Sequence, residues 1–203
     1  MTRRRTTHNV GNNGDLFARL GKLEAENLRL RKEVEFLRRN PTIAKGLTGE
    51  SLIAKLVSGQ PAPKGASHDL ASGESGLLFE VKYSSLLNTI NGRPYKRWVW
   101  TKLFGELGKK SYDRLLLVGD TDPRFAAHYA DPTSPYVIFD LPYDAAIEIT
   151  GGLKMGRSSC IHLTTNPTTV RSQRAVALFC DYQVSASDLH NRYASIQAAG
   201  SEI

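Results

Sequence analysis

The sequence has few cysteines and no long apolar segment. Its 203 residues include two cysteines, Cys160 and Cys180, which are too few for a disulfide framework or a four-ligand zinc site. No run approaches the roughly 18 apolar residues that a membrane-spanning helix requires, and the first residues lack the apolar stretch of a signal peptide. We therefore expect a soluble, cytoplasmic protein with buried thiols.

Motifs that define several enzyme classes are also missing. The sequence contains no phosphate-binding G-x-x-x-x-G-K-S/T loop, no G-x-G-x-x-G dinucleotide motif and no G-x-S-x-G nucleophile elbow. Its five histidines do not have the spacing of metal ligands or of a base that activates a nucleophile. NTP-driven and acyl-transfer activities therefore find no support.

Acidic residues are outnumbered by basic ones, and the excess is uneven along the chain. The formal net charge is +7 at pH 7. Residues 1–40 hold ten basic and five acidic residues, whereas residues 41–203 hold seventeen and fifteen. A basic balance of this kind favours a polyanionic partner, most often nucleic acid.

Residues 15–40 carry a seven-residue repeat of leucines. We assign these leucines to position d of a heptad and the residues between them to position a. The residues expected to dimerise are Leu16, Leu20, Leu23, Asn27, Leu30, Val34 and Leu37. A buried amide at one a position, here Asn27, pairs with its twin only in a parallel, in-register dimer. The pattern predicts a parallel, leucine-zipper-like coiled coil; a single amphipathic helix packed on the rest of the protein is the alternative.

The segments on either side set the limits of this zipper. Residues 1–14 combine basic residues with a glycine-containing stretch, so we interpret them as a flexible basic arm and not as the continuous basic helix of a DNA-reading zipper protein. Pro41 disfavours helical geometry in the preceding residue, so the zipper helix is expected to end near Asn40. After a short linker, a second unit is predicted over residues 47–203.

The second unit has a mixed pattern of helices and strands. Helices are predicted at 47–59, 94–110, 122–131 and 185–200, strands at 77–84, 112–120 and 135–142, and a hairpin over 70–76. This order predicts an α/β sandwich with a mixed sheet.

The strand at 77–84, "LLFEVKYS", carries opposite charges. Because side chains alternate between the faces of a strand, Glu80 and Lys82 are neighbours on one face while the other face is apolar. Asp69 lies eleven residues before Glu80, and the predicted hairpin would bring the two side by side. The alternative is an ordinary antiparallel strand with one solvated face.

Asp69, Glu80 and Lys82 resemble the motif of the PD-(D/E)xK nuclease superfamily, to which type II restriction endonucleases belong. The resemblance covers residues 47–142 and implies an αβββαβ core. It further implies that Asp69 and Glu80, with the carbonyl of Val81, hold Mg²⁺. Lys82 would position the attacking water and offset the charge of the phosphate. Whether one or two ions act stays open.

Two further residues bear on this resemblance. His68 stands where the family often has proline, and it could contact DNA or a water molecule. Glu50 lies in the first turn of the predicted 47–59 helix, where many relatives carry a glutamate near the metal. The alternative for Glu50 is an acid favoured by the dipole at a helix N-terminus.

Two segments are predicted to contact DNA. The segment from Lys82 to Lys110 contains seven basic residues and one acidic residue, and the segment 151–180 contains no acidic residue. The candidate DNA-binding residues are Arg93, Lys96, Arg97, Arg157, Arg171, Gln173 and Arg174. Because arginine and glutamine pair with base edges, segment 151–180 is a candidate for base recognition. The alternatives are a solvated basic helix face for the first segment and an edge extension of the sheet for the second.

Together these features predict a Mg²⁺-dependent, sequence-specific endonuclease that cuts double-stranded DNA as a homodimer or a higher oligomer. A DNA methyltransferase acting on the same site is a further candidate partner. Two alternatives stay open: a Holliday-junction resolvase or another structure-selective nuclease of the same fold, and a non-catalytic, zipper-dimerised DNA-binding regulator.

Overall fold

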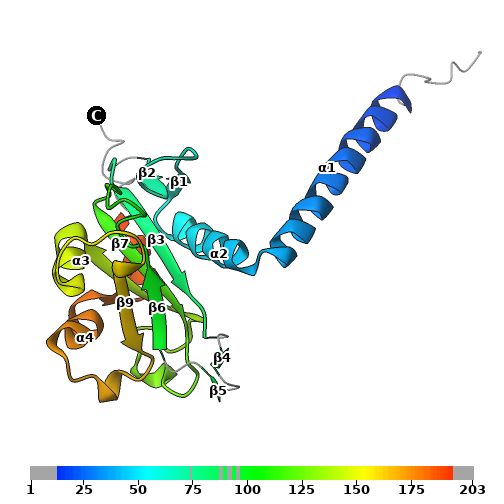
Figure 1. Cartoon of the computed structure of the whole chain (residues 1–203). Helices are drawn as coiled ribbons and strands as arrows, with labels where there is room; N and C mark the ends of the chain where they lie inside the picture. The colour runs from blue at the N-terminus through cyan, green and yellow to red at the C-terminus, as the bar shows by residue number, and fades with distance from the viewer. Residues whose placement is uncertain (1–12, 74, 87–88, 91–92, 95–96, 194–203) are drawn as a thin grey trace, which may run out of the picture. The chain divides into compact units, whose positions relative to one another are not determined.

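A computed structural model describes residues 13–73, 75–86, 89–90, 93–94 and 97–193 (Figure 1). The chain divides into two units, Met1–Ala44 and Lys45–Ile203. None of the helices in the described part of the chain combines the length and the apolar character needed to cross a membrane. The predicted basic arm, residues 1–14, falls almost entirely outside the described residues.

The first unit contains one long helix, α1 (Asn13–Arg39). The apolar seam residues Leu16, Leu20, Leu23, Leu30 and Val34 are exposed in the single chain. The predicted end of the helix near Asn40 is confirmed, since the side-chain amide of Asn40 donates to the carbonyl of Phe36 (2.9 Å) just beyond the last helical residue. An exposed apolar seam is what a coiled-coil helix presents to a partner.

The predicted linker after Asn40 is wrong, because α2 spans Pro41–Leu56 without interruption. Proline suits the first turn of a helix, where its missing N–H would have no intrahelical partner. The backbone N–H groups of Ile43 and Ala44 donate to the carbonyl of Asn40 at 3.0 and 3.1 Å. The helix also ends before Gly59, which opens a strand.

The second unit is built around a six-stranded mixed sheet. Its strands, in spatial order, are β1 (Gly59–Pro61), β2 (Leu70–Ser72), β3 (Leu78–Ser84), β7 (Arg114–Asp120), β8 (Tyr136–Pro142) and β10 (Gln183–Val184). Strands β3 and β7 pair in parallel, and the other neighbours pair antiparallel. The mixed sheet and the hairpin between β2 and β3 are confirmed.

Apolar side chains cover both faces of this sheet. On one face, α2 and α5 (Ala186–Tyr193) pack against side chains such as Phe79 and Val81 of β3. On the other face lies an antiparallel ribbon of β6 (Arg97–Thr101) and β9 (Cys160–Thr164). Helices α3 (Tyr143–Thr150) and α4 (Gln173–Ala177) carry side chains that pack against the same apolar cluster. The remaining elements are β4 (Thr89–Ile90), β5 (Arg93–Pro94), 3₁₀ turns at Ala126–His128, Gly156–Ser158 and Pro167–Thr169, and a π turn at Leu178–Tyr182.

The predicted helix at 94–110 is wrong, because Arg97–Thr101 form strand β6. Trp98 and Trp100 are buried while Arg97 and Thr101 are exposed, which is the two-residue alternation of a strand. Large aromatic side chains favour such a half-buried strand. The chain therefore reaches β7 through a β-ribbon strand where the αβββαβ order requires a helix.

Two other predicted helices are shorter than expected. Of residues 122–131, only Ala126–His128 form a 3₁₀ turn. The last helix, predicted over 185–200, is α5, which ends at Tyr193; residues 194–203 lie outside the described residues.

The indoles of β6 hold the ribbon on the sheet. Trp98 Nε1 donates to the carbonyl of Asp120, and Trp100 Nε1 donates to the carbonyl of Val118, each at 2.9 Å. Gly119, between these two acceptors, leaves room for Trp98, since a Cβ at Gly119 would lie 2.5 Å from Trp98 Nε1. The glycine is therefore part of the packing of ribbon on sheet.

Gly119→Ala should lower the free energy of unfolding by about 1–3 kcal/mol, because the indole of Trp98 must move to admit the methyl group. Urea unfolding followed by tryptophan fluorescence measures this loss. Gly46→Ala is the control, since nothing lies within 4 Å of a Cβ at that helical position; it should keep or slightly raise stability. Wild-type stability in Gly119→Ala would contradict this account of the packing.

Candidate active site

The structure brings together Asp69, Glu80 and Lys82 at the hairpin of β2 and β3. Asp69 directly precedes β2, and its backbone N–H donates to the carbonyl of Phe79 (2.9 Å). Its Oδ2 accepts from the backbone N–H of Val81 (2.9 Å). Lys82 Nζ contacts Glu80 and lies 3.8 Å from Asp69 Oδ2. The hairpin thus aligns one carboxylate from outside β3 with the two charged side chains within it.

Glu80 is a carboxylate without solvent exposure. Its side chain is 0% exposed, whereas those of Asp69 and Lys82 are 17% and 21% exposed. Burial raises the pKa of Glu80 to about 7, although the charge of Lys82 opposes the rise. Because Glu80 and Lys82 alternate with residues that face α2, they lie on the sheet face that carries the β6–β9 ribbon.

A second lysine, which the sequence analysis did not identify, completes the cluster. Lys110 Nζ lies 3.0 Å from Asp69 Oδ1 and 2.5 Å from each carboxylate oxygen of Glu80. Burial alone would raise the pKa of Asp69, but the charges of Lys82 and Lys110 and the Val81 N–H together hold it below its usual value. The site therefore balances two carboxylates with two ammonium groups.

The parallel pairing of β3 and β7 is the structural feature that brings Lys110 to the cluster. Phe79 lies opposite Arg114 in the register of that pair. The residues just before β7 therefore reach the start of β3, where Asp69 and Glu80 lie. The sequence alone offered two adjacent lysines, 109 and 110, forty or more residues beyond Asp69, and no pattern that selects one of them.

Glu50 and His68 lie near this cluster without joining the carboxylate pair. Glu50, on α2, is half-buried, and its pKa is raised by burial and by the charge of Asp69. It lines a groove of about 360 Å³ whose other lining residues are Leu47, Ser51, Ala54, Lys55, Gly59, Pro61 and Leu70. His68 Nδ1 lies 3.5 Å from the hydroxyl of Ser67.

The donor set of the cluster fits one hard cation. Two carboxylates already enclose a positive charge, the ammonium of Lys110, and the backbone of Val81 is bonded to one of them. Within the described ranges, no three or more His, Cys, Asp or Glu residues form a group that could hold a metal ion. Mg²⁺ is commonly held by one or two carboxylates together with waters and substrate phosphates. Asp69 and Glu80 match that smaller set.

The described candidate DNA-binding residues lie on β6, in the 3₁₀ turn at Gly156–Ser158, and in or just before α4. Arg97 is exposed on β6 and lies opposite Thr164 of β9. It therefore belongs to a strand and not to the solvated basic helix face that was the alternative for this segment. The candidates of segment 151–180 are also exposed: Arg157, Arg171, Gln173 and Arg174. Strand β9 pairs with β6 and does not extend the edge of the six-stranded sheet. The side chain of Arg93 and the whole of Lys96 lie outside the described residues.

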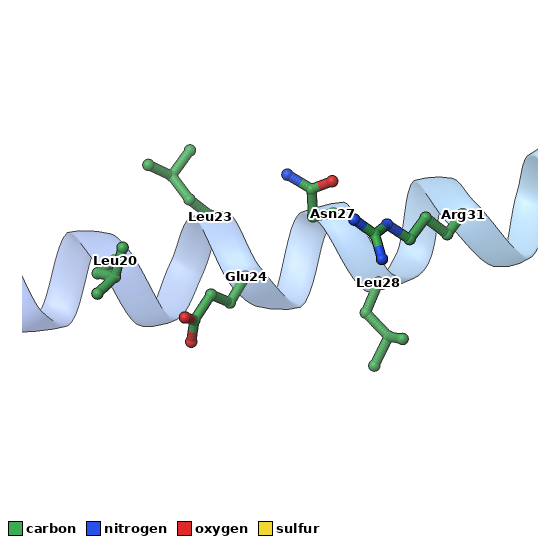
Figure 2. A pocket seen from close by; sticks show the side chains of 6 residues that line it. All are labelled: Leu20, Leu23, Glu24, Asn27, Leu28 and Arg31. Carbon is green, nitrogen blue, oxygen red and sulfur yellow. The ribbon is translucent and has the colours of Figure 1, made fainter.

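The predicted dimerisation seam runs along α1. Figure 2 shows Leu23 and Asn27 projecting from one side of the helix, and Glu24 and Leu28 from the opposite side. Leu23 and Leu28 are 62% and 57% exposed. The helix therefore presents Asn27 next to an apolar seam residue, as a buried amide at position a requires, and it carries a second exposed leucine outside the seam.

Comparison with known proteins gives a distant likeness to a solved structure. The sequence matches no protein-family model and no curated protein. Among solved structures it is similar to a bacterial homing endonuclease, I-Ssp6803I, with 16% sequence identity and a TM-score of 0.43 over 75% of this chain and 94% of that chain. A likeness of this degree carries no argument about the function of the chain.

Asp69→Asn should destabilise the metal-free protein at pH 7 by about 1–3 kcal/mol, because it removes the charge that faces both ammonium groups. The depressed pKa of Asp69 means that this stabilisation is present above the ordinary value of 3.8 and is lost as the pH falls through the lower value of the folded state. The difference from wild type should therefore shrink below about pH 4. Urea unfolding in EDTA across this pH range measures it, with exposed Asp181→Asn as the control.

A gain in stability from Asp69→Asn would contradict this balance of charges. If Asp69→Asn were more stable than wild type at pH 7, repulsion between the two carboxylates would outweigh their attraction to the lysines.

Proposed function

We propose that this chain is a Mg²⁺-dependent endonuclease that hydrolyses phosphodiester bonds of double-stranded DNA as a homodimer. The observation that carries the proposal is the convergence of Asp69, Glu80 and Lys82 in a half-buried cluster. A pair of carboxylates beside an ammonium group offers a place for a divalent cation, and it also offers a positive charge for a phosphate.

The chemistry divides between the ion and the side chains. When bound, Mg²⁺ would stabilise the negative charge of the transition state and lower the pKa of a coordinated water. Asp69 and Glu80 would hold the ion, with the carbonyl of Val81 as a further oxygen ligand. Lys82, 3.8 Å from Asp69 Oδ2, is close enough to the carboxylates to hold the attacking water and to offset the phosphate charge.

DNA would reach this site along the face of the sheet that carries the ribbon. Glu80 and Lys82 lie on that face, and the backbone N–H of Val99 in β6 donates to the hydroxyl of Ser84, two residues beyond Lys82 (2.9 Å). The exposed basic residues of β6 and of segment 151–180 would contact phosphates, and Gln173 with the arginines would read base edges. This combination favours a sequence-specific enzyme.

Dimerisation through the coiled coil would bring a second protomer, with its own active site, to the DNA. A parallel pair of α1 helices is related by a two-fold axis, which mirrors the symmetry of a palindromic DNA site. Each protomer would then cut one strand of the duplex.

Asp69→Asn and Glu80→Gln should each lower the rate of plasmid cleavage in Mg²⁺ at least about a hundredfold, because a ligand to the ion is lost. Agarose gels of supercoiled and linear DNA measure this rate, with EDTA as the metal-free reference. Glu148→Gln, an exposed acid on α3, is the matched control and should cut like wild type. Discrete fragments from linear DNA are the expected product.

Two other outcomes would replace the proposal. Cutting confined to four-way junctions would indicate a junction resolvase. A gel shift of DNA that stays whole in Mg²⁺ would indicate a zipper-dimerised regulator without catalytic activity.

Asn27→Leu should strengthen self-association while loosening its specificity, because a central apolar residue removes the amide pair that sets register and oligomeric state. Sedimentation equilibrium measures both effects, and trimers or mixed species are expected. Leu28→Ala is the control, since Leu28 lies outside the seam; it should stay dimeric. A purely dimeric Asn27→Leu protein would contradict the register assigned to the helix.

A further inference from the structure

Lys110 occupies the centre of the carboxylate pair. Its ammonium nitrogen lies within 3.0 Å of one oxygen of Asp69 and of both oxygens of Glu80. Lys82, in contrast, approaches Asp69 no closer than 3.8 Å. A divalent cation shared by the two carboxylates would need the space that the Lys110 ammonium fills. Two positive charges at such short range repel strongly in a partly buried site, so the two cations exclude each other.

The local backbone holds Lys110 in this place. Gly105 has φ +77° and packs against the aliphatic stem of the lysine, since a Cβ at Gly105 would lie 2.9 Å from Lys110 Cγ. The backbone N–H of Lys110 donates to the carbonyl of Phe104 (3.2 Å). The next residue, Ser111, donates to the carbonyl of Ser67 (3.2 Å), two residues before Asp69. The loop is therefore hydrogen-bonded to the segment that carries Asp69, and Gly105 leaves space for the aliphatic stem of Lys110.

The adjacent lysine shows that the arrangement is specific to position 110. Lys109 is exposed, whereas the side chain of Lys110 is 24% exposed. The pKa of Lys110 is raised by Glu80 and Asp69, against the opposing effect of burial. Of the two adjacent lysines, Lys110 is therefore the one whose ammonium lies against Asp69 and Glu80.

We propose that Lys110 is an intramolecular counter-cation of the metal site: its ammonium neutralises Asp69 and Glu80 in the metal-free protein, and a divalent ion displaces it on binding. This inference rests on the proposed function, because it needs a metal ion that binds the same two carboxylates. It adds a positioning residue that keeps the carboxylates together before the ion arrives. It also makes metal binding an exchange of cations, which lowers the affinity for the ion.

Isothermal titration of the full chain with Ca²⁺, repeated with Mg²⁺, tests the exchange. Lys110→Met removes the competing charge and should bind Ca²⁺ on the order of tenfold more tightly than wild type, the equivalent of one charge-assisted hydrogen bond. Lys109→Met should bind like wild type. Lys110→Arg keeps a positive charge and should not gain affinity. Equal or weaker Ca²⁺ binding by Lys110→Met, compared with a wild type that does bind, would overturn the inference.

Acetylation of lysines in the wild-type protein gives an independent test that needs no variant. Mass spectrometry after a brief pulse of an amine-reactive acetyl donor reports the reactivity of each lysine. Saturation with Ca²⁺ should free the Lys110 amine and raise its labelling several-fold, while Lys109 should keep its labelling. Unchanged labelling of Lys110 at Ca²⁺ saturation would overturn the exchange even if Lys110→Met failed to fold.

The outcomes separate this inference from the proposed function. If wild type and variants all fail to bind Ca²⁺ and Mg²⁺, the metal site itself is absent, and both proposals fall. If wild type binds the ion and cuts DNA while Lys110→Met shows no gain, the nuclease proposal stands and the role of Lys110 is overturned.

Discussion

The structure of the second unit depends on how it accommodates the buried carboxylate of Glu80. Placing an ionised group away from water is costly unless partners of opposite charge surround it. Glu80 has two such partners, Lys82 from its own strand and Lys110 from the loop before β7. Asp69 shares both of them. The four side chains form one electrostatic unit, in which the two ammonium groups offset the cost of burying Glu80.

The sheet topology brings these four groups together from distant parts of the sequence. The hairpin of β2 and β3 supplies three of them, and the parallel pairing of β3 with β7 delivers the fourth. Apolar packing then makes the arrangement rigid, because Phe79 and Val81 fix the other face of β3 beneath α2 and α5. On the face of the charged cluster, the indoles of Trp98 and Trp100 bind the ribbon to β7. The proposed binding of a metal ion and a phosphate would need such support to hold the ligands in place.

Local patterns in the sequence predicted the elements whose period is unambiguous. The alternation of "LLFEVKYS" predicts both strand β3 and the shared face of Glu80 and Lys82. The heptads predict helix α1. The same alternation occurs in "RWVWT", but Pro94 suits the first turn of a helix and so favours the wrong element there. Pro41 correctly predicts the end of α1. It also begins α2, where the sequence predicts a linker. Lys110 could not be identified, because its partners are set by the parallel pairing of two strands and not by spacing along the chain.

The central claim is that the two carboxylates bind a divalent ion at the position where the lysine ammonium lies. The most direct measurement is anomalous diffraction from crystals of the full chain soaked in Mn²⁺. The account predicts one strong peak about 2 Å from oxygens of both Asp69 and Glu80, with the Lys110 ammonium moved out of the space between them. A peak elsewhere, or no peak with Lys110 still bound to both carboxylates, would contradict it.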